Sequence, residues 1–235
     1  MVSHLSAAVL HGLPLWDDLL DRVHLTRDRV TGAKLRRYSQ LHVGALSTDE
    51  ITELDGIRVT TVARTAVDVA RTQSFVRSVA IGDAALAAGL EQAELARAVD
   101  RAIGRRGVAA ARRMLDFCDG RSESVGESTS RVVLRDAGLP APDLQYKVYD
   151  GAALMARVDF CWEEANTIGE FDGRIKYGRL LRRGQSAGEA VYDEKMREDM
   201  LRDLGWQVVR WIWSDLRHPQ LVADRLNRAF VRGRP

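Results

Sequence analysis

The stretches Val158-Asp159-Phe160 and Gly169-Glu170-Phe171-Asp172-Gly173 decide the fold predicted for the second half of the chain. Each belongs to a run of strand-forming residues and places acids near the end of that run. Asp159 and Glu170 are 11 residues apart, about the length of one tight hairpin. Two adjacent antiparallel strands would bring their carboxylates together, and a divalent metal ion commonly neutralises such a cluster. The pattern therefore indicates metal-assisted chemistry on a phosphate.

The segment 120–235 is predicted to form an α/β domain, with a mixed sheet flanked by helices. A helix before a strand meander, followed by a helix that crosses to a parallel strand, gives this architecture. Within one strand, the period of two places Val158 and Phe160 on one face and Asp159 on the other. The expected helices cover 126–137, 188–204 and 219–231, and the expected strands cover 144–149, 155–162, 167–172 and 207–213.

The segment 1–119 is predicted to be an α+β domain that is mostly helical. We place the boundary near Gly120-Arg121-Ser122, where the composition changes. Glycines 89, 104 and 107 punctuate its alanine-rich helices. The expected strands cover 23–26, 35–43 and 56–60, and the expected helices cover 5–10, 62–71, 75–88, 91–103 and 107–118.

The composition describes an ordinary globular protein with a formal net charge of +2. This charge does not require a nucleic-acid partner, so any such partner must be argued from local clusters. The sequence lacks a run of roughly 18 apolar residues and a signal peptide, which predicts a cytoplasmic protein without a membrane contact. Cys118 and Cys161 have no ligand spacing and are expected to be free thiols.

A further acid, Glu127, is expected near the buried side of the helix over 126–137. A glutamate close to a core needs a partner or a metal ion, although an acid at a helix N-terminus is also favoured by the helix dipole. Three motifs together resemble the PD-(D/E)XK nuclease superfamily, in its very-short-patch-repair-endonuclease-like branch. They are the helix residue Glu127, Val-Asp-Phe at 158–160 and Glu-Phe-Asp-Gly at 170–173. The resemblance covers about 120–235 and implies a restriction-endonuclease-like fold. Further matching residues are Arg197-Glu198-Asp199, Leu201, Gly205-Trp206, Val208 and Arg210.

The resemblance implies a Mg²⁺ or Mn²⁺ site. Asp159, Glu170 and the backbone carbonyl of Phe171 would hold the ion, and Glu127 would act through a metal-bound water. The superfamily's catalytic lysine is expected at the position of Asp172, so this acid departs from the pattern. We favour Lys195 over Lys176 as the source of the missing ammonium group.

Basic residues follow the acids closely. They could bind along a DNA backbone, because a guanidinium group can donate two hydrogen bonds to one phosphate. Alternatively, they could belong to an ordinary solvated loop. The residues are Arg174, Lys176, Arg179, Arg182 and Arg183. For Trp206, Trp211 and Trp213, core packing is favoured over base stacking.

The first half contains His4 and His11 on one helix face, which we expect to pack or cap. It also contains Arg64 and Asp68 at a spacing of four, which predicts a helix-surface pair. The stretches at 3–14 and 59–70 resemble the C-terminal part of AbiEi-type antitoxins of type IV toxin–antitoxin systems. The resemblance spans about 1–100. Such proteins usually begin with a winged helix, so either that domain is absent here or the true start lies upstream of Met1.

The sequence thus favours a metal-dependent DNA endonuclease, a hydrolase that acts in a toxin–antitoxin or defence system. The alternative is a non-catalytic AbiEi-like antitoxin or transcriptional regulator, whose degenerate nuclease fold binds DNA or a partner protein such as a cognate toxin. Asp172 favours the alternative, whereas the set of Glu127, Asp159 and Glu170 favours the enzyme.

Overall fold

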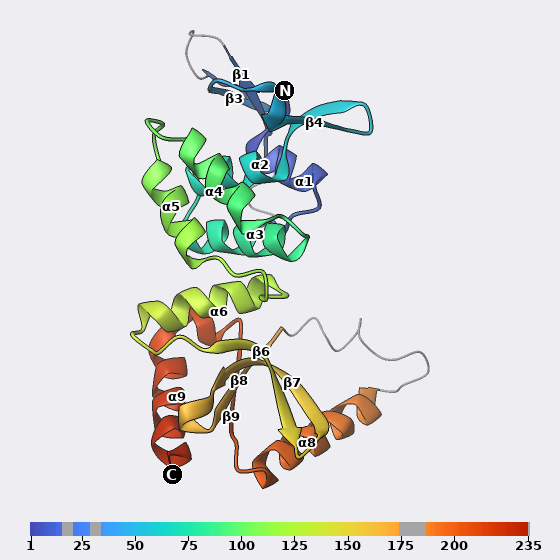
Figure 1. Cartoon of the computed structure of the whole chain (residues 1–235), viewed down its shortest axis with the longest axis vertical. Helices are drawn as coiled ribbons and strands as arrows, with labels where there is room; N and C mark the ends of the chain where they lie inside the picture. Colours follow the sequence, from blue (N-terminus) through green and yellow to red (C-terminus); the bar gives the residue numbers. More distant parts are fainter. Residues whose placement is uncertain (16–20, 29–33, 174–186, 235) are drawn as a thin grey trace. The chain divides into compact units, whose positions relative to one another are not determined.

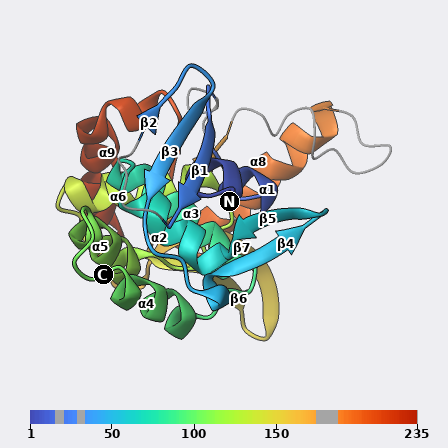
Figure 2. The same ribbon diagram turned by 90° about the horizontal axis from the view of Figure 1, so that it is seen from above.

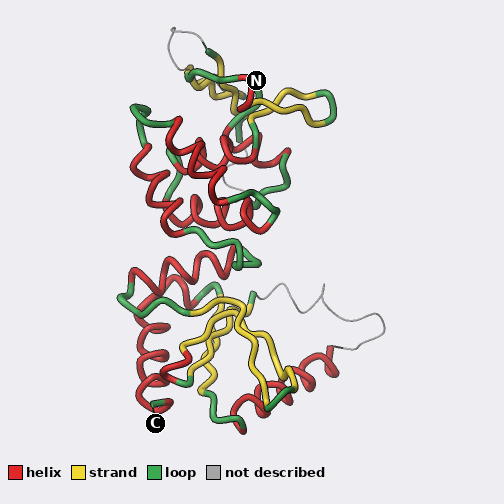
Figure 3. Tube along the Cα trace, in the orientation of Figure 1, coloured by secondary structure: helices red, strands yellow, loops and turns green. Residues whose placement is uncertain are grey.

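The structure is a computed structural model that describes residues 1–15, 21–28, 34–173 and 187–234. The chain divides into two compact units, Met1–Val125 (unit 1) and Gly126–Pro235 (unit 2). The division lies a few residues beyond the boundary predicted at 119/120. Helix predominates in unit 1, whereas strands form the centre of unit 2 (Figure 3). Within the described ranges, every helix is too short or too polar to cross a lipid bilayer.

The helices of unit 1 pack around α2, whose residues from Ala63 to Ala70 are all buried (Figure 1). Thr61 caps this helix, because its Oγ1 accepts a hydrogen bond from the Arg64 N–H at 3.4 Å. The predicted helices are confirmed, with ends that differ by one or two residues. They are α1 (His4–Leu10), α2 (Val62–Ala70), α3 (Phe75–Ala87), α4 (Gln92–Arg101) and α5 (Val108–Phe117).

Short strands complete unit 1 (Figure 2). They are β1 (Val23–Arg27), β2 (Lys34–Leu35), β3 (Ser39–Val43), β4 (Ile51–Leu54) and β5 (Ile57–Thr60). β3 pairs in parallel with β1 and antiparallel with β2, and β4 forms a hairpin with β5. The single strand expected over 35–43 is wrong, since a turn closed by the Arg36 N–H and the Ser39 carbonyl at 2.8 Å divides it. β4 was not predicted from the sequence.

The described part of unit 2 confirms the predicted order of helices and strands. Its elements are α6 (Val125–Asp136), β6 (Asp143–Asp150), β7 (Ala153–Trp162), β8 (Thr167–Asp172), α8 (Ala187–Asp203), β9 (Gln207–Ile212) and α9 (Pro219–Gly233). The sheet order is β6-β7-β8-β9. The first three strands are antiparallel, and β9 runs parallel to β8 after the crossover through α8.

The sheet of unit 2 buries both faces. On one face, α6 and α9 pack against Phe160, Trp162 and Trp211. The Trp211 indole donates a hydrogen bond to Ser130 Oγ at 2.8 Å, which satisfies its buried N–H. Val158, Ile168 and Leu201 of α8 belong to a separate apolar cluster on the other face. The predicted core role of Trp211 is confirmed, and Trp206 and Trp213 pack at the edges of these clusters.

The paired strands β6 and β7 exchange faces at Gln145 and Asp159. Val158 packs with the α8 cluster, but Phe160 packs with the α6 and α9 cluster. The expectation that these two side chains share a face is therefore wrong. The physical reason is local: Gln145 has a φ of 51°, and the register between Leu144–Phe160 and Tyr146–Val158 skips its pairing with Asp159. A non-glycine residue in this conformation stores backbone strain.

Phe171 supplies a matched test of the packing on the α6 face. A Cβ at Gly126 would lie 1.9 Å from a carbon of the Phe171 ring, whereas a Cβ at Gly173 would lie 3.4 Å from the same carbon. We expect Gly126→Ala to lower the free energy of unfolding of unit 2 by about 1–3 kcal/mol, because a close-packed core cannot absorb the methyl group. Gly173→Ala should change it little. Equal losses in urea unfolding of the two variants would contradict this packing.

Candidate functional site

Two arginines hold the buried carboxylate of Glu170 in unit 2. Arg197 of α8 donates from Nη2 to both oxygens of Glu170, at 2.6 and 2.8 Å. Arg210 is the register partner of Glu170 on β9, and its Nη2 lies 3.0 Å from Oε2. Glu170 is only 8% exposed. Its charge is therefore balanced by guanidinium groups from two different elements.

Acids of α8 extend this pairing into a network. Glu194 contacts both Arg197, at 2.8 Å, and Arg210, and Glu198 lies 3.0 Å from Arg210 Nε. Burial opposes the charged form of Arg197, but the hydrogen bond to Glu194 and the charge of Glu170 outweigh it and raise its pKa. Burial likewise opposes ionisation of Glu194, and the hydrogen bonds from both arginines outweigh it and lower its pKa. The network therefore favours the charged forms of Arg197 and Glu194.

One carboxylate oxygen of Asp159 is hydrogen-bonded to the backbone of the neighbouring strand β8. Its Oδ2 accepts a hydrogen bond from the Phe171 N–H at 2.9 Å. The register of β7 with β8 ends at Phe160–Gly169, one step before Asp159 would face Glu170. The Asp159 side chain thus accepts a hydrogen bond from β8 just beyond the last main-chain pairing of β7 with β8.

Glu127 is buried, as the sequence predicted, at 6% exposure. It lies on α6, which packs on the sheet face opposite to α8. Its Oε2 accepts a hydrogen bond from Nε2 of Gln145 at 2.9 Å. Gln145 is the strained residue at which the strands exchange faces. The convergence of Glu127, Asp159 and Glu170 on one cation stays a prediction. The contacts described link Glu127 to Gln145, Asp159 to the Phe171 N–H, and Glu170 to Arg197 and Arg210.

This arrangement does not fit a metal ion well. Among residues 1–15, 21–28, 34–173 and 187–234, no group of three or more His, Cys, Asp or Glu side chains is placed to hold one. The Mg²⁺ or Mn²⁺ expected at Glu127, Asp159, Glu170 and the Phe171 carbonyl stays a prediction. Arginine already supplies the positive charge that a cation would bring to Glu170.

The remaining predicted residues are placed as follows. Asp172 is half-buried at the end of β8, and Lys195 is exposed on α8. The α8 side chain that reaches Glu170 is instead Arg197, two residues further along. The predicted DNA-contacting residues, Arg174, Lys176, Arg179, Arg182 and Arg183, lie outside the described residues.

Unit 1 contains a second buried charge cluster, centred on Arg64. Its Nε donates to Asp68 at 2.8 Å, and its Nη1 lies 2.9 Å from Glu50. Arg64 is 2% exposed and Asp68 is fully buried. The expectation of a helix-surface pair is therefore wrong: i, i+4 spacing fixes the contact, but α2 is the central helix of the unit and has no wet face there.

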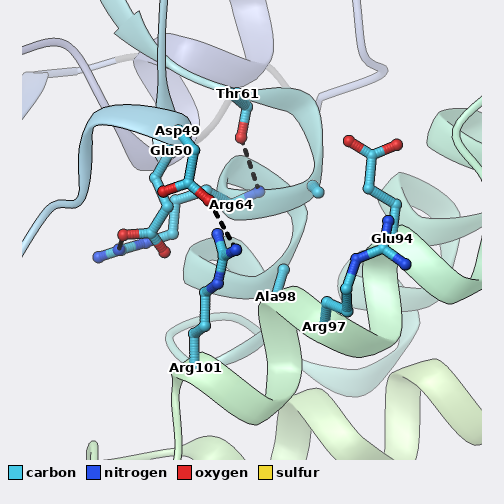
Figure 4. Close-up of a pocket in the computed structure, with 9 residues that line it drawn as sticks. Asp49, Glu50, Thr61, Arg64, Glu94, Arg97, Ala98 and Arg101 are labelled. Atoms are coloured by element: carbon cyan, nitrogen blue, oxygen red, sulfur yellow. Dashed lines mark hydrogen bonds and ion pairs between the residues drawn. The ribbon is translucent and has the colours of Figure 1, made fainter.

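A pocket of about 210 Å³ opens above this cluster (Figure 4). Arg64 and Glu50 line it, together with Arg101, which pairs with Asp49 at 2.6 Å. Glu94 and Arg97, from the same face of α4, also line the pocket and are exposed. The pocket therefore presents charges of both signs over an ordered ionic base.

Three imidazoles stack in unit 1. His4 and His42 lie with ring centroids 3.5 Å apart, and His24 Nδ1 lies 3.0 Å from His42 Nε2. Burial, together with the neighbouring His24 and Arg71, lowers the pKa of His42 to about 4. Burial also lowers the pKa of His4 well below its usual value. The predicted packing role of His4 is confirmed by this stack. His11 is the C-cap residue of α1, and its Nε2 lies 2.7 Å from the Thr60 carbonyl.

Comparison with known proteins places the first half of the chain in a family. Residues 1–117 match the AbiEi antitoxin C-terminal domain. Two uncharacterized proteins, from two strains of Mycobacterium tuberculosis, are each 36% identical over 206 residues, which is 86% of this chain and 73% of the relative. No solved structure matches. The chain belongs to the family of these mycobacterial proteins, and its first half is an AbiEi antitoxin C-terminal domain.

The imidazole stack predicts a loss of stability in mild acid. The folded-state pKa of His42, about 4, lies below the value of 6.5 for a free imidazole. The unfolded chain therefore binds more protons, and the stabilisation is complete above pH 6.5 and is lost as the pH falls toward 4. We expect the free energy of unfolding of unit 1 to decrease between pH 7 and 5, and to decrease less in His42→Gln. A wild-type value that is constant over this interval would contradict the assignment.

Proposed function

We propose that this chain is a non-catalytic antitoxin that neutralises a cognate toxin by direct binding through unit 1. The observation that carries the proposal is the match of residues 1–117 to an antitoxin domain. Unit 1 also has its own apolar core, built from residues of α1 to α5. It can therefore present a preorganised surface to a partner.

The pocket of unit 1 is the surface that we assign to the toxin. Its base is ordered, because Arg64 is held by Asp68 and Glu50 and cannot rearrange without leaving a buried charge unpaired. At the rim, Glu94 and Arg97 form no ion pair within the part of the chain that the structure describes. Exposed charges of both signs on a fixed base favour a protein partner with complementary charges over a small apolar ligand.

The second unit supports the non-catalytic assignment. A nuclease of the predicted kind needs acids that are available to a cation, but both oxygens of Glu170 accept hydrogen bonds from Arg197. Asp159 is hydrogen-bonded to the backbone of Phe171. We propose that unit 2 keeps the helix and strand order of a nuclease as a binding or structural module. DNA cleavage is the competing outcome that experiment must test.

The proposal is tested by charge reversal at the rim of the pocket. We expect Arg97→Glu to weaken binding of the cognate toxin by roughly 30-fold, as for a central interface residue, and to abolish rescue of cells that co-express the toxin. The matched control is Arg113→Glu, which reverses an exposed arginine on α5 of the same unit. Rescue should survive in the control, because Arg113 does not line the pocket.

Two results would contradict the proposal. Equal rescue by the two variants would remove the pocket from the toxin interface. Magnesium-dependent cleavage of plasmid DNA by the wild-type chain, lost in Asp159→Ala, would instead establish the enzyme.

A further inference from the structure

The β2–β3 hairpin of unit 1 carries a concentrated positive charge. The segment from Lys34 to Val43 reads KLRRYSQLHV and contains no acid. The turn that joins the strands holds Arg36 and Arg37, both exposed. Since the whole chain has a net charge of only +2, these arginines form a local cluster rather than part of a general excess.

The side chains around this turn are set for contact with a partner. The Arg37 guanidinium lies 4.9 Å from the centroid of the Tyr38 ring, a cation–π stack. Tyr38 is 67% exposed and Leu35 is 68% exposed. Within the described ranges, neither Arg36 nor Arg37 forms a salt bridge. Large side chains and unpaired guanidiniums are thus presented together at one turn.

We propose that this hairpin binds duplex DNA, with Arg36 and Arg37 on the phosphates and Tyr38 against the groove wall. The inference is independent of toxin binding, because it uses a surface other than the pocket. A two-stranded ribbon fits the major groove of B-form DNA, whereas the deep, narrow major groove of duplex RNA excludes it. A guanidinium held by an aromatic ring keeps its planar fork available for phosphate oxygens.

The register supports this geometry. Leu35 pairs with Gln40, and Lys34 pairs with Leu41, so the ribbon is fixed just below the turn. The Val23 N–H donates to the Tyr38 carbonyl at 3.0 Å, which anchors the end of the turn to the strand β1. The arginines therefore stand on an ordered support, so that little ordering remains to be done on binding.

The test compares two double variants of the full chain that remove the same charge. Arg36→Gln with Arg37→Gln alters the hairpin, and Arg112→Gln with Arg113→Gln alters adjacent exposed arginines on α5. Binding to a fluorescent duplex of random sequence is measured by anisotropy over a salt series. We expect the hairpin variant to bind roughly tenfold or more weakly at 0.1 M salt, with a log–log salt slope smaller by about 1.8, and the α5 variant to match the wild type.

Equal affinities and slopes for the two variants would overturn the proposal. It would also be overturned if the hairpin variant lost only toxin binding, since the surface would then face a protein, or if duplex RNA bound as tightly as DNA. A measurement on the wild type guards against misfolded variants: ultraviolet cross-linking to the duplex should map to the peptide that contains Tyr38. A cross-link map without that peptide would reject the assignment.

Discussion

The interaction on which unit 2 depends is the contact of Glu170 with Arg197 and Arg210. A carboxylate that is 8% exposed needs positive charge beside it, because desolvation of an unpaired anion costs several kcal/mol. The chain supplies that charge from α8 and from β9, and the contact thereby links the crossover helix to the parallel strands β8 and β9. The same pairing supplies positive charge to Glu170 without a cation, which supports the non-catalytic function proposed above.

Unit 1 follows the same principle with different elements. Arg64 of α2 is buried against Asp68 and Glu50, and Arg71 adds a further contact to Asp68 at 2.9 Å. Here the ion pairs lie at the base of a pocket, whereas in unit 2 they connect a helix to the sheet. In both units, buried carboxylates thus form ion pairs with arginines. Exposed charges remain at the pocket rim and at the hairpin turn, where partners can reach them.

Much of the fold followed from sequence pattern, and the departures have local causes. The helices of unit 1 and the element order of unit 2 were predictable from periodicity and from glycine punctuation. The face exchange was not, because nothing in the residue type of Gln145 indicates a φ of 51°. Hairpin spacing predicts that Asp159 and Glu170 converge. It does not reveal that Arg197, from a later helix, donates hydrogen bonds to both oxygens of Glu170. The contact of Arg210 with Glu170 could be anticipated from one feature of the sequence: Arg210 lies on the strand after that helix, which pairs in parallel with the strand of Glu170. The burial of Arg64 could not be read from its spacing to Asp68.

The central claim, that arginines rather than a divalent cation balance Glu170, is tested most directly by thermal unfolding of the full chain against magnesium concentration. The tryptophan fluorescence of unit 2 reports the transition, with ionic strength held constant by NaCl. An ion that binds only the folded state raises the midpoint, and the stabilisation grows with the logarithm of the ion concentration once that concentration exceeds Kd. We predict that the midpoints coincide with and without Mg²⁺. A midpoint that rises with Mg²⁺ in the wild type, and no longer rises in Glu170→Gln, would contradict the account.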